Sequence, residues 1–130
     1  MTFLRPWSEQ IYALMRIVVG FLFLCHGVQK LMMGAPPPEM PAPMFWATTL
    51  IETLGGGLVM IGFFAGPAAF IASGTMAVAY FIAHHSLQAL LPIQNKGELA
   101  TLYCWVFLYI ASRGAGIWSV DAVRGAGRAA

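Results

Sequence analysis

Residues 16–33, RIVVGFLFLCHGVQKLMM, decide the fold of this chain. The stretch is apolar enough to lie in a lipid bilayer, but five polar or reactive side chains interrupt it: Arg16, Cys25, His26, Gln29 and Lys30. A charged side chain at the bilayer centre costs about 2.5–3.5 kcal/mol on insertion scales, so such residues tend to face a partner or a cavity. The stretch therefore predicts a membrane-spanning helix whose polar side chains meet polar groups elsewhere in the chain.

The composition of the whole chain also indicates a membrane protein. Of the 130 residues, 59% are hydrophobic and only 9% are charged, and the mean hydropathy is +0.74. A soluble domain is about 25% charged, so this chain lacks the polar side chains to cover a water-facing surface. The net charge of +2 is too small to indicate a nucleic-acid partner. We expect a single domain over residues 1–130, without a separate soluble catalytic domain.

Four apolar stretches use nearly all of the chain, and they predict an all-α fold, a membrane four-helix bundle. The expected helices cover roughly residues 9–33, 44–64, 67–90 and 98–112. A helix needs about 20 residues to cross a hydrocarbon core of about 30 Å. The segment GAPPPEMPAP at 34–43 contains five prolines and is expected to be a stiff connector or a lid over one mouth of the bundle.

Glycines predict where the helices pack most closely. Gly20 and Gly27 recur on the same stripe of the first helix as Arg16 and Lys30, and the second helix contains three consecutive glycines at 55–57. Small residues allow the backbones of two membrane helices to approach each other. We therefore expect the first two helices to meet along these glycines.

Four spans place both chain termini on the same side of the membrane. That side carries the arginines of the terminal segments: Arg5, Arg113, Arg124 and Arg128. The opposite side carries Lys96 and, at a helix end, Lys30. Because Lys and Arg are enriched in cytoplasmic segments, we expect both termini in the cytoplasm of a multi-pass protein of the bacterial inner (plasma) membrane.

With this orientation, polar side chains from all four helices gather in the outer half of the bundle. They are His26, Gln29, Lys30, Glu52, His84 and Glu98. The inner half offers Arg16 and little else. Ionisable residues inside a membrane usually mark function, and histidine exchanges protons near neutral pH. This cluster is the strongest functional signal in the sequence.

Two interpretations of the cluster come first. A quinone headgroup has two carbonyl oxygens, which need donors such as His, Lys or Gln and aromatic walls. Candidate wall residues are Phe23, Trp46 and Tyr103. The alternative is a purely structural network, in which Lys30 or Arg16 pairs with the Glu52 carboxylate inside the bundle.

Metal-based alternatives are weaker. Haem would take His26 and either His84 or His85 as axial ligands. Zinc or iron would need His84, His85, Glu52 and Glu98, although adjacent histidines on a helix point about 100° apart. We therefore assign no metal site. Cys25 and Cys104 lack metal-binding spacing and are either free thiols or a disulfide.

Three stretches of the chain resemble the DoxX family of small four-helix bacterial membrane proteins. They are RIVVGFLFLCHGVQKL in the first helix, IETLGGGLVMIGF in the second, and NKGELATLYCWVFLYIASRGAGIWSVD at the fourth. The family-like residues are Arg16, Gly20, His26, Gly27, Lys30, Glu52, Gly55, Gly56, Glu98, Ser119 and Asp121. The family is similar to a subunit of an archaeal thiosulfate:quinone oxidoreductase, and other members are linked to membrane oxidoreductase complexes and to quinone or oxidative-stress responses. The resemblance therefore implies a membrane protein of a redox system.

Together, the residues and the resemblance favour a membrane subunit or accessory of a redox system that binds a quinone or another small redox-active molecule. Glu52 and His26 are the expected catalytic, proton-handling residues. The expected ligand contacts are Lys30, Gln29, His84, Glu98 and Arg16. The expected partners are the lipid bilayer and a soluble oxidoreductase, with a homo-oligomer left open. The alternatives are a non-catalytic anchor or scaffold for partner enzymes and a small-solute transporter.

Overall fold

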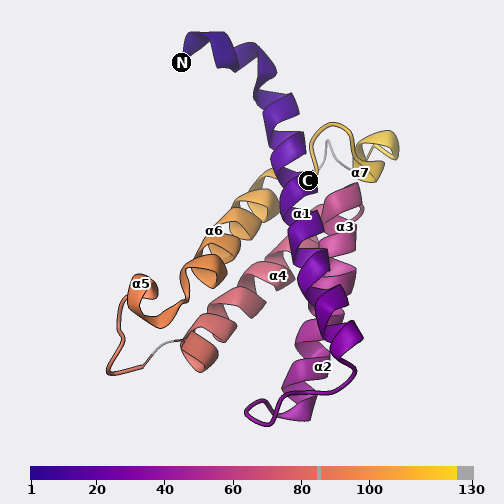
Figure 1. Cartoon of the computed structure of the whole chain (residues 1–130). Coiled ribbons are helices and arrows are strands. Elements are labelled where there is room, and N and C mark those ends of the chain that lie inside the picture. Colours follow the sequence, from indigo (N-terminus) through magenta and orange to yellow (C-terminus); the bar gives the residue numbers. More distant parts are fainter. Residues whose placement is uncertain (85, 126–130) are drawn as a thin grey trace.

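The described part of the chain, residues 1–84 and 86–125 of the computed structural model, folds into helices joined by loops (Figure 1). No strand occurs within these residues. Three helical segments in this part are long and apolar enough to cross a membrane: Thr2–Met33, Ala42–Ile61 and Ala65–His84. Helix α6 (Glu98–Arg113) extends over about 24 Å, which is less than a hydrocarbon core of about 30 Å. The all-helical fold is confirmed, whereas the four-span bundle stays a prediction.

The first span begins with the 3-10 turn η1 (Thr2–Trp7) and continues as α1 (Ser8–Met33). It ends at Gly34, whose left-handed backbone (φ 73°) cannot continue a right-handed helix. The second span consists of α2 (Ala42–Leu50), the π-helical segment η2 (Ile51–Gly55) and α3 (Gly56–Ile61).

The third span consists of α4 (Ala65–Ala79) and a second π-helical segment, η3 (Tyr80–His84). Two short helices flank α6: α5 (Pro92–Asn95) precedes it, and α7 (Val120–Val123) follows it.

Two predicted helix ends are wrong, and local backbone conformation explains both. The second helix is expected through residue 64 but ends at Ile61, because Gly62 and Phe64 adopt left-handed backbone conformations (φ 72° and 47°). The third helix is expected through residue 90 but ends at His84. Residues 86–89 instead form a turn, in which Ser86 and Ala89 exchange backbone hydrogen bonds of 3.2 and 3.4 Å.

Helix α1 packs backbone to backbone against the second span. A Cβ atom at Gly20 would lie 2.5 Å from the backbone nitrogen of Met60, and one at Gly56 would lie 2.5 Å from the backbone nitrogen of Leu24. Real side chains do not tolerate such distances, so the two helices can approach this closely only because glycine has no side chain. The prediction that glycines bring these helices together is confirmed.

The second helix pair consists of α4 and α6, which pack along most of their length (Figure 1). Helix α4 offers a buried face of alanines: Ala65, Ala68, Ala69 and Ala72. Where α1 crosses this pair, the Phe23 ring lies 5.4 Å from the Tyr103 ring and 4.7 Å from the Phe107 ring between centroids. These aromatic contacts form the centre of the core and join the two pairs.

The residues that follow α6 return to the N-terminal half of α1 and close one end of the molecule. The Tyr12 hydroxyl donates a hydrogen bond of 2.5 Å to the carbonyl of Gly114. The Asp121 carboxylate accepts hydrogen bonds from the backbone N–H groups of Phe64 (3.0 Å) and Ala65 (3.1 Å). A carboxylate far away in the sequence therefore caps α4 and complements its dipole. We call this region the closed end.

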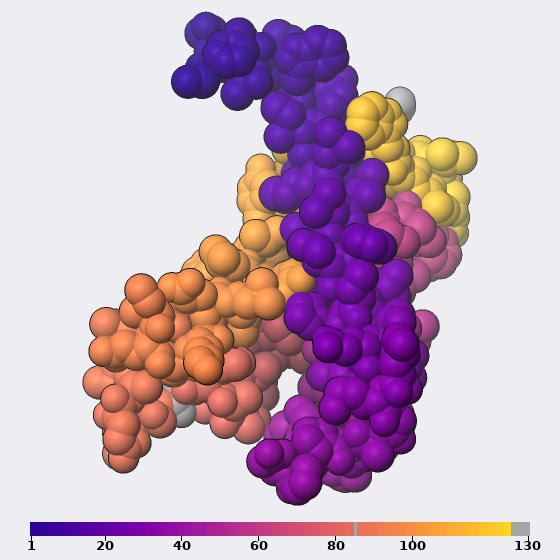
Figure 2. Space-filling view, viewed as in Figure 1, coloured from indigo at the N-terminus to yellow at the C-terminus, as the bar shows by residue number. Residues whose placement is uncertain are grey.

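At the opposite end the two helix pairs diverge, and a hollow opens between them (Figure 2). The loop over residues 34–41 lies on one side of this hollow, and the segment over residues 86–97 lies on the other. The Phe23 contacts with α6 join the two pairs at the centre of the core, and the Asp121 cap of α4 joins them at the closed end. The divergence therefore leaves room for a site at the open end.

Candidate functional site

A cavity of about 320 Å³ lies at the open end between the two helix pairs. Its ionisable and hydroxyl-bearing lining residues are His26, Lys30, Thr48, Glu52, His84, Lys96 and Tyr103. Phe23, Met76 and several small residues of α4 and α6 complete the wall. Every long helix therefore contributes at least one lining residue. We call this space the polar cavity.

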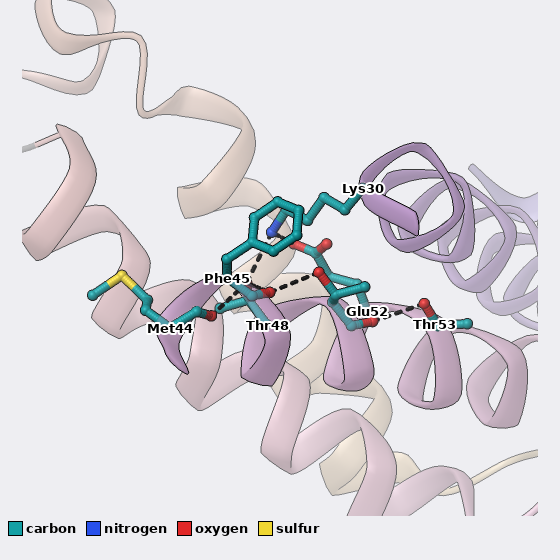
Figure 3. A network of polar contacts seen from close by, with 7 residues as sticks. Lys30, Met44, Phe45, Thr48, Glu52 and Thr53 are labelled. Atoms are coloured by element: carbon teal, nitrogen blue, oxygen red, sulfur yellow. Dashed lines mark hydrogen bonds and ion pairs between the residues drawn. The ribbon is translucent and has the colours of Figure 1, made fainter. Parts of the chain in front are cut away.

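The polar cavity is organised around an ion pair between α1 and the second span (Figure 3). The Lys30 ammonium lies 3.1 Å from Glu52 Oε1 and 2.9 Å from Thr48 Oγ1. The Lys30 side chain is 22% exposed and the Glu52 side chain only 8%. Thr48 stands four residues before Glu52, on the same face of the helix, so both acceptors meet one donor. The pair satisfies part of the hydrogen-bonding capacity of a buried carboxylate.

The second carboxylate oxygen of Glu52 has no such contact. Glu52 Oε2 is buried and has no hydrogen-bond partner among the described residues. Buried polar atoms in native proteins are nearly always hydrogen-bonded, and an unpaired one costs about 1–3 kcal/mol or more when it is charged. Because Glu52 lines the polar cavity, a donor from a ligand or from water is the available partner.

Two histidines face the polar cavity from opposite helix pairs. The His26 ring on α1 meets the edge of the Tyr103 ring on α6, with centroids 5.9 Å apart and planes 85° apart. The His84 Nδ1 lies 3.3 Å from the backbone carbonyl oxygen of Asn95. Tyr103 is nearly buried, at 6% exposure, so its ring orients His26 from the core side. Each imidazole has one fixed neighbour and can still offer a ring nitrogen to a ligand.

Both π-helical segments of the described residues lie beside this cavity. Segment η2 carries Glu52, and η3 ends at His84. A π-helical turn is rare, costs stability and often occurs at functional sites, because it changes the direction of a side chain within an otherwise regular helix. The two departures from α-helical geometry therefore coincide with two of the predicted site residues.

The structure brings four predicted site residues together and leaves three outside. His26, Lys30, Glu52 and His84 line the polar cavity. Gln29 and Glu98 are exposed and do not line it. Arg16 lies at the closed end, about 21 Å before Lys30 along α1.

Thr48, Met40 and Lys96 line the polar cavity without having been predicted as site residues. The four-residue spacing of Thr48 and Glu52 was a usable signal, because it puts both side chains on one helix face. Nothing in the local sequence predicts that the loops carrying Met40 and Lys96 border the polar cavity. Trp46, expected as a wall, instead lies on the outer side of α2 beside Leu50.

The metal alternatives gain no support from the described residues. Within them, no group of three or more His, Cys, Asp or Glu side chains is arranged to hold a metal ion. His85, which the zinc or iron alternative requires, lies outside the described residues, as does Arg128. Cys25 and Cys104 are free thiols. Ser73 donates a 2.7 Å hydrogen bond to the backbone carbonyl of Cys104, which ties α4 to α6.

Apolar helices of membrane-spanning length, together with large exposed hydrophobic side chains along them, define a multi-pass membrane protein. The model of the family described as DoxX matches residues 11–85, which include the four predicted site residues that line the polar cavity. A protein of Haemophilus influenzae named "Uncharacterized protein" is 38% identical over 125 residues, covering 91% of this chain and 93% of that protein. No solved structure matches the chain. The chain belongs to the DoxX family, and the resemblance inferred from its motifs is confirmed.

Proposed function

We propose that this protein is an integral subunit or accessory of a redox system in the bacterial inner membrane and binds a quinone or another small redox-active molecule in the polar cavity. The observation that carries the proposal is Glu52 Oε2, a buried carboxylate oxygen without a partner among the described residues. It lies in a cavity that also offers the Lys30 ammonium and the His26 imidazole. A bound molecule that donates a hydrogen bond to Glu52 Oε2 would supply the missing partner of this oxygen.

The lining of the polar cavity matches the chemistry of a quinone headgroup. The two ring carbonyls of a quinone accept hydrogen bonds, and Lys30 and the Tyr103 hydroxyl are donors. Protons taken up when a quinone becomes a quinol would pass through His26 and Glu52. The electrons would be exchanged with a soluble oxidoreductase partner.

The test is ligand retention by protein purified in mild detergent, measured by solvent extraction and mass spectrometry and by titration with a decyl-substituted benzoquinone. Wild-type protein is expected to bind the quinone. Glu52→Gln keeps the shape of the side chain but removes the charge, and His26→Phe keeps the ring that contacts Tyr103. Each change should weaken binding by about tenfold or more, the worth of a hydrogen bond to a charged group.

Glu98→Gln is the matched control, because Glu98 is an exposed carboxylate of the same predicted cluster that does not line the cavity. It should bind like the wild type. Thermal unfolding of every variant separates lost binding from lost folding. If well-folded wild-type protein binds no quinone and Glu52→Gln changes nothing, the ion pair is structural and a scaffold function replaces the redox proposal.

A further inference from the structure

A second cavity, of about 470 Å³, runs between α2 and α4 on the membrane-facing side of the molecule. Met44 of α2 lines one wall, and Phe70, Gly74, Val78 and Ile82 line the other. Phe70 is 64% exposed, and Val78 and Ile82 are 57% and 58% exposed. In a membrane these side chains face lipid, so the cavity is an open groove in contact with the bilayer. We call it the apolar groove.

The apolar groove offers almost no hydrogen-bonding groups to an occupant. Its two hydroxyl groups belong to threonines that already donate within their own helices. Thr48 donates to the carbonyls of Met44 and Phe45 (2.9 and 3.0 Å), and Thr75 donates to the carbonyl of Ile71 (2.8 Å). An occupant of this groove is therefore a hydrocarbon chain rather than a polar molecule.

The apolar groove is continuous with the polar cavity. Met40, Thr48, Ala79 and Ala83 line both spaces. Thr48 marks the boundary, because its hydroxyl oxygen accepts from the Lys30 ammonium while its side chain also borders the groove. One molecule can thus place a polar group beside Lys30 and Glu52 and extend an apolar chain toward the lipid.

We infer that the ligand of this protein is an amphiphile: a hydrogen-bonding ring occupies the polar cavity, and its hydrocarbon tail leaves through the apolar groove into the bilayer. This inference rests on the proposed function and deepens it by naming the substrate class. The ligand enters sideways from the membrane rather than from water. Since lipid chains are as apolar as the groove, the groove adds little affinity for the tail and acts as its route.

Gly74 provides a direct test of this route. It lines the apolar groove, and a Cβ atom added there meets nothing within 4 Å. A side chain at position 74 therefore starts in open space, and we expect the leucine of Gly74→Leu to fill the groove rather than to disturb the helix packing. Gly57 of α3 is the matched control, because its added Cβ also meets nothing within 4 Å and it does not line the groove. Both changes replace a helical glycine by the same side chain.

The experiment measures binding of two probes to the whole protein in lipid nanodiscs of fixed composition. One probe is a decyl-substituted benzoquinone, and the other is the same ring with a methyl group in place of the chain. Gly74→Leu should weaken binding of the decyl probe by about tenfold, because the leucine side chain occupies the path of the decyl chain, and leave the methyl probe unchanged. Gly57→Leu should leave both probes unchanged.

A photoreactive diazirine at the end of the decyl chain gives a second readout. In the wild type it should label residues of α2 or α4 that line the apolar groove, and Gly74→Leu should abolish this labelling. If both probes bind and Gly74→Leu affects them equally or not at all, the tail route is wrong while the ring site stands. If the wild type binds neither probe, the proposed function itself fails, and this inference fails with it.

Discussion

Arg16 shows how a charged residue can be used inside the membrane without a ligand. Its side chain is fully buried, and its guanidinium donates to four backbone carbonyls at the closed end. The acceptors are Val59 (2.9 Å), Met60 (2.8 Å), Ile117 (3.2 Å) and Trp118 (2.8 Å). These carbonyls belong to the end of α3 and to the segment before α7. The planar group of Arg16 thus joins α1 to two segments distant in sequence, which explains why it does not line the polar cavity.

We expect Arg16→Lys to lower the stability of the protein without removing ligand binding. A lysine ammonium cannot reach four carbonyls in this planar arrangement, so about two hydrogen bonds should be lost, at roughly 1–3 kcal/mol in total. Thermal unfolding in detergent measures the effect, with Arg5→Lys in the exposed η1 turn as the control. Lost quinone binding at unchanged stability would contradict this assignment and return Arg16 to the ligand contacts.

At the scale of the helices, eight of the eleven family-like residues separate into three groups with different tasks. Arg16, Ser119 and Asp121 build the closed end. Gly20 and Gly56 bring α1 and α3 into backbone contact, and His26, Lys30 and Glu52 line the polar cavity. The closed end and the glycine contact fix the crossing of the helices. They thereby set the distance over which Lys30 reaches Glu52.

The glycine contact makes a specific prediction about stability. Gly56→Leu should destabilise the protein by about 1–3 kcal/mol or prevent folding, because the new side chain overlaps the backbone of Leu24. Gly57→Leu, one residue later on the same helix, points into open space and should be tolerated. Thermal unfolding of the two variants, purified side by side, measures the difference. Equal stability would show that α1 and α3 are farther apart in the folded protein.

At the scale of the whole molecule, the polar cavity and the closed end lie at opposite ends of the long helices. The terminal segments meet at the closed end, where Arg113 forms an ion pair with Glu9 and Tyr12 bonds to Gly114. The loop over residues 34–41 lies at the open end (Figure 1), and its Met40 lines the polar cavity. If the termini are cytoplasmic, as the arginine distribution predicts, the ligand site is in the outer half of the membrane.

Labelling with a membrane-impermeant maleimide in intact bacterial cells tests this arrangement. Cys25 and Cys104 are first replaced by alanine, and one new cysteine is then introduced as Thr2→Cys or Glu39→Cys, both at exposed positions. We expect position 39 to react in intact cells and position 2 only after permeabilisation. Reaction at position 2 in intact cells and at position 39 only after permeabilisation would show the opposite orientation. Reaction at both positions in intact cells would contradict the placement of the two positions on opposite sides.

The amino-acid sequence alone determined the membrane class, the helix-forming stretches and the contact of α1 with the second span. These follow from hydropathy, from proline and glycine positions and from helical spacing, which are local properties. The spacing of Gly27 and Lys30 on one stripe was visible in the same way. The helix ends at Ile61 and His84 were not visible, because the backbone conformations of a few residues decide them and the hydropathy pattern does not report those conformations.

Only the tertiary structure decided which polar groups meet. From the sequence, Glu52 could pair with Lys30 or with Arg16, and Glu98 was an equal candidate for the site. The crossing of α1 over η2 brings Lys30 to 3.1 Å from Glu52, whereas Arg16 meets carbonyls of segments more than 40 residues away. Side-chain partners depend on how separate helices approach and where the chain reverses. That information is distributed over the whole fold and is absent from any single stretch.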